Sequence, residues 1–281
     1  MKIICLLLGT LLSFACNHSK QQKDEIYSRH LQRQVQLTII HTPIPSDKSQ
    51  LNLLILNDGQ DMEKMGLREI LDSLIDKGAI EPLVVVAIHA GDRMQEYGVA
   101  GEPDYMGHGS RAGFYDSFID NELYPFAKKR AGVRKFKSVT IAGWSLGGLS
   151  AFDIAWNHPE KIDRVGVFSG SFWWRNKSTD DSSYSDEKNR IMYAKLKASR
   201  KKPKLQYWFY AGTAEENSDR DQDGIIDVDD DTRDIIVLLE NKKITVPGDI
   251  IYKETKDGKH ELPYWRAAFP EFLVWSFGKE N

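Results

Sequence analysis

The residue of this sequence whose setting most clearly indicates chemistry is a serine flanked by glycines, which could act as a nucleophile. Residues 143–147 have the sequence GWSLG, which matches G-x-S-x-G with Ser145 at its centre. An apolar run at 139–142 precedes this motif and a helical pattern at 146–156 follows it, which is the context of a nucleophile elbow. We therefore predict that Ser145 is a nucleophile and that the N–H of Leu146 is one oxyanion donor. The alternative is a glycine-rich turn with an incidental serine.

A general base is expected downstream, because serine sites on strand–turn–helix elbows run in the order serine, acid, histidine. Of the seven histidines, only His158 and His260 follow Ser145. His158 precedes Pro159 at the far end of the helix that starts at the serine, so it lies a helix length away. His260 lies in a polar turn before the last expected helix. We predict that His260 takes the hydroxyl proton and returns it to the leaving group; the alternative is a solvated loop histidine.

The acid that orients the histidine should lie on the loop after a strand expected at 205–210. Glu215 and Glu216 both occupy that loop, and Asp234 is a more distant option. We favour Glu216 and leave the other two open.

A second oxyanion donor and an aromatic pocket complete the expected site. The donor is the amide of Gln60, in the Asn-Asp-Gly-Gln turn after an early strand; the alternative is an ordinary Asp-Gly turn. Trp144 adjoins the serine, and Trp173 and Trp174 follow a later strand, so we expect these rings to line the substrate pocket. Of the adjacent pair, we expect one ring to be buried in the core and one to contact an aryl or sugar group.

An acidic loop has the spacing of a calcium site. Its carboxylates stand at positions 1, 3, 5, 9 and 12 of residues 219–230, with Gly224 at position 6. The predicted ligands are Asp219, Asp221, Asp223, Ile225, Asp227 and Asp230. Position 12 is aspartate where glutamate is usual. Without a cation these carboxylates would repel one another, so we predict structural calcium that orders the loop and holds Glu216; the alternative is a solvated acidic loop. No organic cofactor is expected.

Alternating strand and helix patterns predict the elements that position these residues. Strands are expected at 35–41, 51–56, 83–88, 139–142, 165–168, 205–210 and 250–252. Helices are expected at 67–75, 114–129, 146–156, 235–239 and 264–277, with surface loops at 90–112 and 175–185. This alternation predicts a mostly parallel sheet with helices on both faces, as in the α/β-hydrolase fold.

The first residues have the features of an export signal: a basic start, a short apolar run and small residues before Cys16. We predict a signal peptide over 1–16 with lipidation at Cys16, ordinary signal-peptidase cleavage being the alternative. A flexible tether over 17–30 and a single α/β domain over 31–281 would follow. The protein would then be exported, either anchored at the periplasmic face of a membrane or released. Both cysteines lie in the leader, so the domain has neither a disulfide nor a thiol nucleophile.

Composition bounds the remaining choices. A chain of 281 residues with 41% hydrophobic residues can form one α/β domain with a sizeable core. The formal net charge of −3 does not suggest a nucleic-acid partner, which would need a basic patch.

The chain also resembles the esterase D-like family of α/β hydrolases, which includes feruloyl esterases, siderophore trilactone esterases, S-formylglutathione hydrolases and mycobacterial mycolyltransferases. The residues that carry the resemblance are 54–60 (LILNDGQ), 118–125 (FIDNELYP), 142–148 (AGWSLGG), 157–160 (NHPE), 168–174 (FSGSFWW) and 257–260 (DGKH), with the aromatic helix around Trp265. Asn57 stands where the family usually has an apolar residue or aspartate.

The resemblance implies Ser145 and His260 in the roles given above, and the mycolyltransferases, with an acid shortly after Gly-Thr, support Glu216. It implies hydrolysis of carboxylic esters through an acyl-enzyme, with a small-molecule or oligosaccharide substrate such as an acylated or feruloylated carbohydrate or a siderophore lactone. The alternatives are an acyltransferase on the same scaffold and a non-catalytic, calcium-stabilised binding module.

Overall fold

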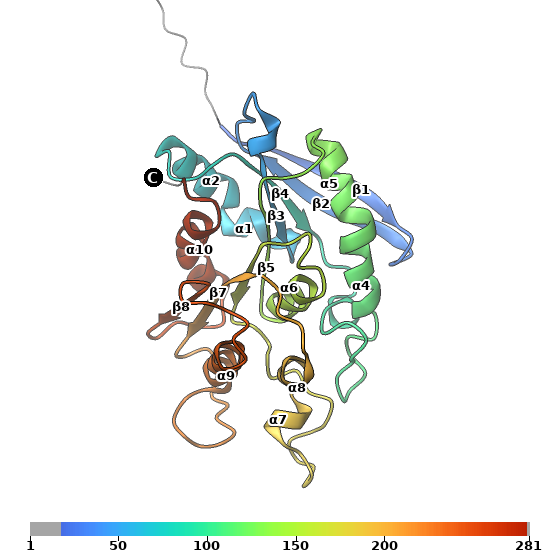
Figure 1. The fold of residues 1–281 in the computed structure, drawn as a ribbon, viewed down its shortest axis with the longest axis vertical. Helices are drawn as coiled ribbons and strands as arrows, with labels where there is room; N and C mark the ends of the chain where they lie inside the picture. The colour runs from blue at the N-terminus through green and yellow to red at the C-terminus, as the bar shows by residue number, and fades with distance from the viewer. Residues whose placement is uncertain (1–17, 280–281) are drawn as a thin grey trace, which may run out of the picture.

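The computed structural model describes residues 18–279. One eight-stranded sheet crosses the molecule, in the strand order β1-β2-β4-β3-β5-β6-β7-β8 (Figure 1). The strands are β1 Lys20–Ser28, β2 Arg33–His41, β3 Asn52–Leu56, β4 Leu83–Ile88, β5 Val139–Trp144, β6 Arg164–Phe168, β7 Gln206–Gly212 and β8 Ile250–Thr255.

The sheet is parallel from β4 to β8, and only β1 and β2 run antiparallel to their neighbours. The central strands β3, β4 and β5 are buried along their whole length, as expected for parallel strands covered on both faces. The α/β-hydrolase fold predicted from the sequence is therefore confirmed.

Helices cover both faces of the sheet. They are α1 Met62–Met65, α2 Leu67–Asp76, α3 Arg93–Glu96, α4 Ala112–Phe118, α5 Tyr124–Ala131, α6 Leu146–Asn157, α7 Asp186–Asn189, α8 Ile191–Ala198, α9 Asp227–Asn241 and α10 Leu262–Phe277, with short 3₁₀ turns at Lys48–Gln50 and Gly59–Asp61 and a π turn at Ile119–Leu123. Alternate residues of β3 feed two separate cores: Leu53 and Ile55 face α4–α6 and α8, while Leu54 and Leu56 face α1, α2 and α10. The period of two along each strand produces this division.

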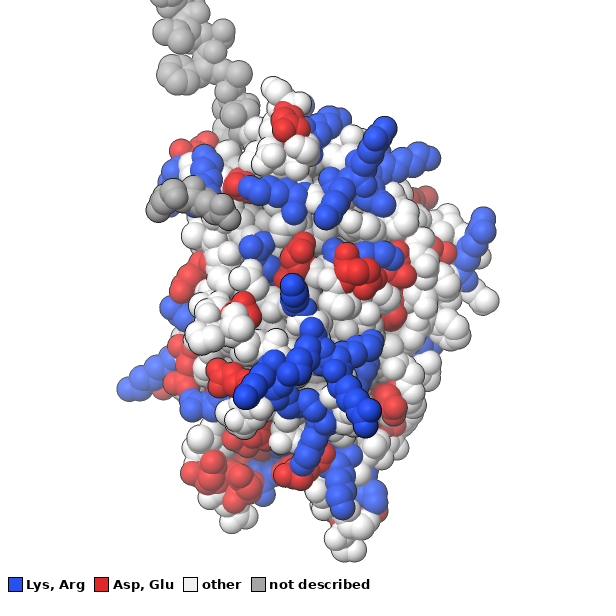
Figure 2. Space-filling view, viewed as in Figure 1, with Lys and Arg blue, Asp and Glu red and all other residues white. Residues whose placement is uncertain are grey.

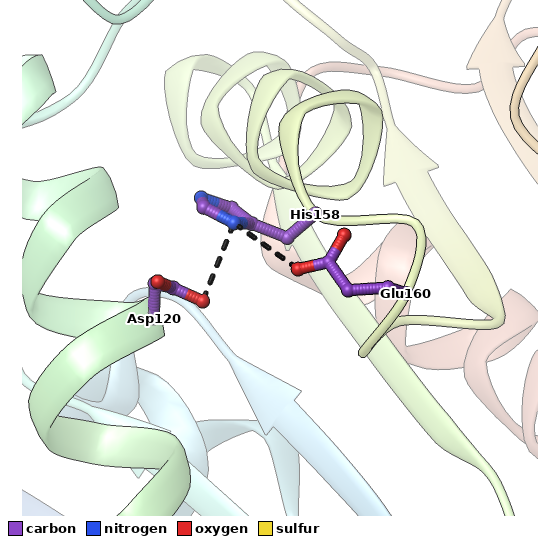
Figure 3. A group of neighbouring side chains, drawn as sticks. All are labelled: Asp120, His158 and Glu160. Atoms are coloured by element: carbon purple, nitrogen blue, oxygen red, sulfur yellow. Dashed lines mark ion pairs between the residues drawn. The ribbon is translucent and has the colours of Figure 1, made fainter.

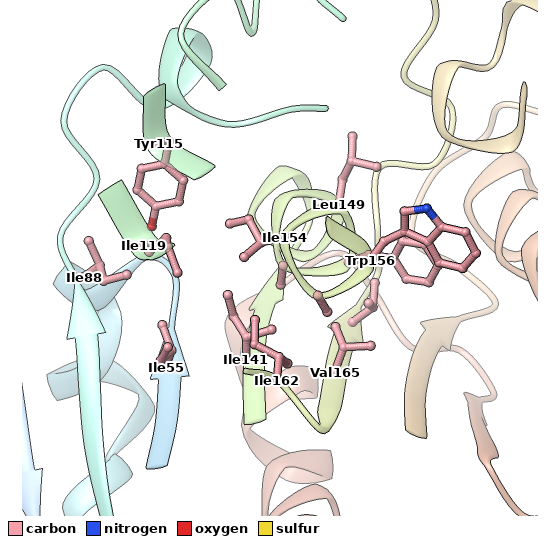
Figure 4. Packing of buried hydrophobic residues seen from close by; sticks show 14 of the residues in the cluster. Ile55, Ile88, Tyr115, Ile119, Ile141, Leu149, Ile154, Trp156, Ile162 and Val165 are labelled. Atoms are coloured by element: carbon pink, nitrogen blue, oxygen red, sulfur yellow. The ribbon is translucent and has the colours of Figure 1, made fainter. Parts of the chain in front are cut away.

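The helix that begins at the glycine-flanked serine is α6, and it is buried on nearly every side. Its Leu149, Ile154 and Trp156 pack over the strands that carry Ile141 and Val165 (Figure 4). All of the helix from Leu146 to Trp156 is buried. Such burial fixes the start of α6 in place, which matters because that start adjoins the candidate nucleophile.

Two predictions about elements need correction. The tether expected over 17–30 is wrong for its larger part, because Lys20–Ser28 forms β1 and pairs with the whole of β2. The single helix expected over 114–129 is divided by the π turn at Ile119–Leu123. The predicted signal peptide and Cys16 lie outside the described residues. Within residues 18–279, none of the helices combines the length and the apolar character needed to cross a bilayer.

Candidate active site

Ser145 lies at the sharp turn between β5 and α6, in a backbone conformation that a serine rarely adopts. Its φ is 55° and its ψ is −128°, which costs about 1–3 kcal/mol and persists only where the surroundings impose it. A Cβ on Gly143 would lie 2.4 Å from the carbonyl oxygen of Gly147, so the turn requires the first glycine of the motif. The Ser145 N–H donates to the carbonyl of Phe168 at 2.8 Å. The residue is only half-buried and open to solvent.

The histidine after β8 pairs with an acid on the loop after β7. His260 Nδ1 lies 2.8 Å from Glu215 Oε2; the glutamate side chain is 0% exposed and the histidine 37%. The imidazole packs edge-on against Trp265 with ring centroids 5.1 Å apart, and Trp265 stacks on Trp144, the neighbour of Ser145. No hydrogen bond joins Ser145 and His260 within residues 18–279. The His260–Glu215 pair therefore lies beside the aromatic cluster that packs against the Ser145 turn, and Nε2 of His260 is left without a partner among the described residues.

Ser169 holds this acid, and the sequence analysis missed it. The Ser169 hydroxyl donates to Glu215 Oε1 at 2.6 Å and accepts from Trp265 Nε1 at 2.8 Å. The Gly212 N–H donates to the same Glu215 oxygen at 2.6 Å. Ser169 is fully buried and has a φ of 52°. The Phe-Ser-Gly-Ser segment after β6 was visible as a family motif, but nothing in the sequence linked its first serine to Glu215.

The preference for Glu216 as the partner of His260 was wrong. Glu216 Oε1 instead accepts from the Val228 N–H at 2.9 Å, at the start of α9. Burial, with Asp227 and Asp231 nearby, raises the pKa of Glu216. Asp234 is also excluded as the partner, because it pairs with Arg190. Of the three acids left open, only Glu215 contacts the imidazole.

The two predicted oxyanion donors lie on facing loops. The Leu146 N–H belongs to the first turn of α6, where backbone donors have no partner within the helix. Gln60 lies in the 3₁₀ turn Gly59–Asp61 after β3, and its side chain donates to Asp58 and accepts from the Ala90 N–H. The Asp58 N–H is not available for an oxyanion, because it donates to the Tyr97 hydroxyl at 3.0 Å. The Gln60 amide remains a prediction.

The tryptophans predicted to line the pocket are mostly buried. Trp144 is 3% exposed beneath Trp265, and Trp174 is 0% exposed, packed against the backbone of Gly98 and Gly109. The prediction of a pocket role is therefore wrong for these two. Trp173 is only half-buried and retains surface for a ligand, with the Arg175 guanidinium 5.9 Å from its ring centre. The expectation that one ring of the adjacent pair is buried agrees with the structure.

The acidic loop brings together part of the predicted calcium set. Oxygens of Asp219, Asp221 and Asp223 lie within 4.8 Å of one another, and Gly224 has the positive φ of 91° that the turn needs. Asp227 instead engages Arg220 through both oxygens and lies outside this group. Figure 2 shows acidic side chains gathered at the lower left, over this loop. Calcium binding stays a prediction.

Asp230 belongs to a second acidic group, with Asp231 and Asp234. Burial raises the pKa of Asp230 to about 6, and Asp234, Asp231, Asp221 and Asp223 add to this shift by repulsion. Asp230, the last predicted ligand, is therefore close enough to be repelled by Asp221 and Asp223, although it lies outside their group.

A second histidine–carboxylate cluster lies at the other end of α6. His158 Nε2 is 3.0 Å from Asp116 Oδ2. On the other side of the ring, Nδ1 faces Asp120 at 3.3 Å and Glu160 at 3.8 Å (Figure 3). The Asp116 hydrogen bond, with the neighbouring carboxylates, raises the pKa of His158. This histidine ends its helix, as the sequence predicted, and both of its nitrogens are engaged.

The fold and the site together define a class of protein. The sheet has a strained serine after β5, an acid after β7 and a histidine after β8, all at the carboxyl ends of parallel strands on one side of the sheet order. These positions are those of an α/β hydrolase.

The chain belongs to the Esterase family, whose model, described as "Putative esterase", matches residues 28–275. An iron(III) enterobactin esterase of Dickeya dadantii is 30% identical over 53% of this chain and 33% of that protein. An uncharacterized protein of Bacillus subtilis, YbbA, is 27% identical over 38% of this chain and 45% of its own length. The chain thus aligns with less than half the length of either relative.

Solved structures share the fold at low identity. The enterobactin esterase of Shigella flexneri has a TM-score of 0.69 and 22% identity, over 91% of this chain and 58% of that one. A ferulic acid esterase has a TM-score of 0.68 and 18% identity, over 92% and 98%. A siderophore hydrolase of Aspergillus nidulans has a TM-score of 0.65 and 16% identity, over 99% and 100%.

Proposed function

We propose that this protein is a serine hydrolase of carboxylic esters that works through an acyl-enzyme. Ser145 is the nucleophile, His260 the general base and Glu215 the acid that orients the imidazole. The observation that carries this proposal is the buried carboxylate of Glu215 paired with Nδ1 of His260, beside the aromatic cluster that packs against the strained elbow. With Nδ1 occupied, Nε2 is the nitrogen that exchanges a proton with the serine.

In the first step, His260 Nε2 takes the proton from Ser145 Oγ as the oxygen attacks the ester carbonyl. The serine–carbonyl bond forms, and the carbonyl oxygen becomes an oxyanion that accepts from the Leu146 N–H and a donor of the loop after β3. The imidazolium then protonates the alkoxide as the ester C–O bond breaks. Water repeats the sequence to release the acid. Catalytic hydrogen bonds often tighten only when substrate is bound, which fits the separate Ser145 and His260 side chains.

We propose that the substrate is a small aryl or polyhydroxylated ester. Partly exposed Trp173 offers a ring face beside the loop of Ser171, and the similar proteins include enterobactin and ferulic acid esterases. We also propose that the protein is exported and anchored through Cys16. Mass spectrometry of the mature N-terminus tests that part: a diacylglyceryl-cysteine supports it, and an unmodified first residue contradicts it.

Hydrolysis of p-nitrophenyl acetate by wild type and Ser145→Ala tests the activity. Ser171→Ala is a control, because this serine adjoins the elbow, where its N–H donates to the Ser145 carbonyl, but its own side chain is buried. We expect a loss of at least about 10³-fold for Ser145→Ala and a change within about threefold for Ser171→Ala. Equal rates for wild type and Ser145→Ala would refute the proposal. A panel of aryl, acetyl, feruloyl and trilactone esters then defines the acyl and alcohol groups.

A further inference from the structure

We propose that Asn57 is a positioning residue that sets the separation of the two sides of the oxyanion hole. The inference rests on the proposed function and deepens it. Asn57 follows β3 directly and is 0% exposed. A fully buried amide in such a place calls for partners at both of its ends.

The side chain of Asn57 bridges two elements from opposite sides. Its Nδ2 donates to the Gly147 carbonyl at 2.7 Å, in the first turn of α6. Its Oδ1 accepts from the Tyr115 hydroxyl of α4 at 2.7 Å. Its backbone N–H donates to the Ala142 carbonyl at 3.0 Å, which extends the β3–β5 pairing by one bond. These three hydrogen bonds of Asn57 therefore lead to the strand and the helix that flank Ser145 and to a buried tyrosine.

The bridge joins the loops that supply the oxyanion donors. A Cβ on Gly147 would lie 2.7 Å from Asp58 Oδ2 and 3.2 Å from Asn57 Cβ, so the α6 turn and the loop after β3 are in direct contact there. Leu146 precedes Gly147, and Gln60 follows Asp58 by two residues. Oxyanion donors act only within about 2.7–3.1 Å of the charged oxygen, so a small change in this contact misplaces them.

The second residue of the loop is held by the same group of side chains. The Asp58 N–H donates to the Tyr97 hydroxyl at 3.0 Å, and the Tyr97 ring meets Tyr115 edge-on with centroids 5.1 Å apart. Arg93 pairs with both carboxylate oxygens of Asp58. Burial raises the pKa of both tyrosines, so their hydroxyls stay protonated and keep these bonds.

Asparagine is specified here because it donates at one end and accepts at the other. An ionised aspartate would place an acceptor against the Gly147 carbonyl and a buried charge without a counterion. A protonated aspartate could restore the donor. Asn57→Asp therefore converts the bridge into one that depends on pH, a behaviour that simple loss of packing does not produce.

The test compares Asn57→Asp with Asn52→Asp in the full-length protein. Asn52 is a matched control, because it is a buried asparagine at the first position of β3 whose amide donates to the Pro82 carbonyl at 3.1 Å and to the Glu81 carboxylate at 3.2 Å, but it lies at the strand end away from Ser145. At pH 8 we expect kcat on p-nitrophenyl acetate to fall about 10²-fold for Asn57→Asp, with KM within about threefold. For Asn52→Asp we expect kcat within about threefold. The ratio of Asn57→Asp to wild-type kcat should rise as the pH falls towards 6, while that of Asn52→Asp stays level.

Equal losses of kcat in the two variants, or a kcat ratio for Asn57→Asp that does not change with pH, would overturn the inference. Thermal melts of both variants show whether they fold. If Asn57→Asp does not fold, Tyr115→Phe replaces it, since it removes only the hydroxyl that orients the amide; an expected fall of about fivefold in kcat supports the inference, and an unchanged kcat overturns it. Failure of the proposed function is distinguishable, because Ser145→Ala would then retain wild-type activity.

Discussion

Two histidine–carboxylate clusters lie in one domain, and they differ in how many imidazole nitrogens the protein engages. His260 gives one nitrogen to a fully buried glutamate and keeps the other clear of described partners. His158 faces Asp116 with one nitrogen and Asp120 and Glu160 with the other. The first arrangement orients a ring and leaves one nitrogen for proton exchange, while in the second the Asp116 hydrogen bond and the neighbouring carboxylates raise the pKa of the imidazole.

The elements explain this difference. His260 lies on a turn at the carboxyl end of β8, where loops from neighbouring parallel strands meet, which is where open α/β sheets place ligands. His158 ends α6 and connects it to α4 and the π turn that carries Asp120. On the proposed mechanism, the same chemical groups serve catalysis at the strand ends near Ser145 and connect helices at the far end of α6.

Replacing each histidine by glutamine should give the largest contrast. We expect His260→Gln to lower kcat/KM for p-nitrophenyl acetate by about 10³-fold or more, because the base is lost. His158→Gln should stay within about twofold. Steady-state kinetics on the two purified variants measure this contrast, and a comparable loss in both would remove the distinction between the clusters.

Replacing Glu215 and Glu216 in turn should show which of the two glutamates orients His260. Glu215→Gln removes the charge that stabilises the imidazolium, so we expect kcat to fall about 10²–10³-fold. Glu216→Gln keeps an acceptor for the Val228 N–H and should cost less than about fivefold. The reverse order of effects, measured with the same ester, would return the acid role to Glu216.

Calcium should bind near the His260 cluster and not near the His158 cluster, because the acidic loop follows Glu215 and Glu216 in the chain. If the sequence prediction of calcium is right, saturation at 100 times Kd adds about 2.7 kcal/mol to stability, and EDTA should lower the melting temperature by about 5 °C. Asp221→Asn, in the convergent carboxylate group, should abolish that response. A melting curve of wild type that is identical with calcium and with EDTA would contradict the prediction.

The smallest expected effect concerns pH and the His158 cluster. The pKa of His158 is raised in the folded protein, chiefly by the hydrogen bond to Asp116. The stabilisation is therefore complete below the unfolded pKa of about 6.5 and is lost as the pH rises through the folded value. Between pH 6 and pH 9 we expect wild type to lose about 2 °C of melting temperature relative to His158→Gln. A difference that grows with pH would contradict this sign.

The sequence could predict the sheet, the elbow and the base, because each has a local signal. Buried parallel strands are continuous apolar runs, as in Leu83–Ile88, whose predicted bounds match β4. Ser145 has fixed glycine spacing, and His260 follows from chain order. By contrast, β1 is a mostly polar edge strand, which the sheet holds by backbone pairing with β2, so its hydrophobic pattern carried almost no signal.

The carboxylate that pairs with His260 could not be identified from the sequence, for a different reason. Glu215 and Glu216 are adjacent and chemically equivalent. Which way each side chain points depends on the backbone conformation of the loop after β7. The selection is made by distant groups: Ser169 and Trp265 hold Glu215, and the start of α9 takes Glu216. The same holds for Asn57, whose partners on α4 and α6 are far apart in the chain.

The central claim is that Ser145 becomes acylated while His260 supplies the base. The most direct measurement is acid quenching during turnover of a slowly hydrolysed p-nitrophenyl ester, followed by peptide mass mapping. The account predicts an acyl mass increment on the peptide that contains Ser145, absent in Ser145→Ala and formed much more slowly in His260→Gln. An acyl group on another residue, or turnover with an undiminished rate in Ser145→Ala, would contradict it.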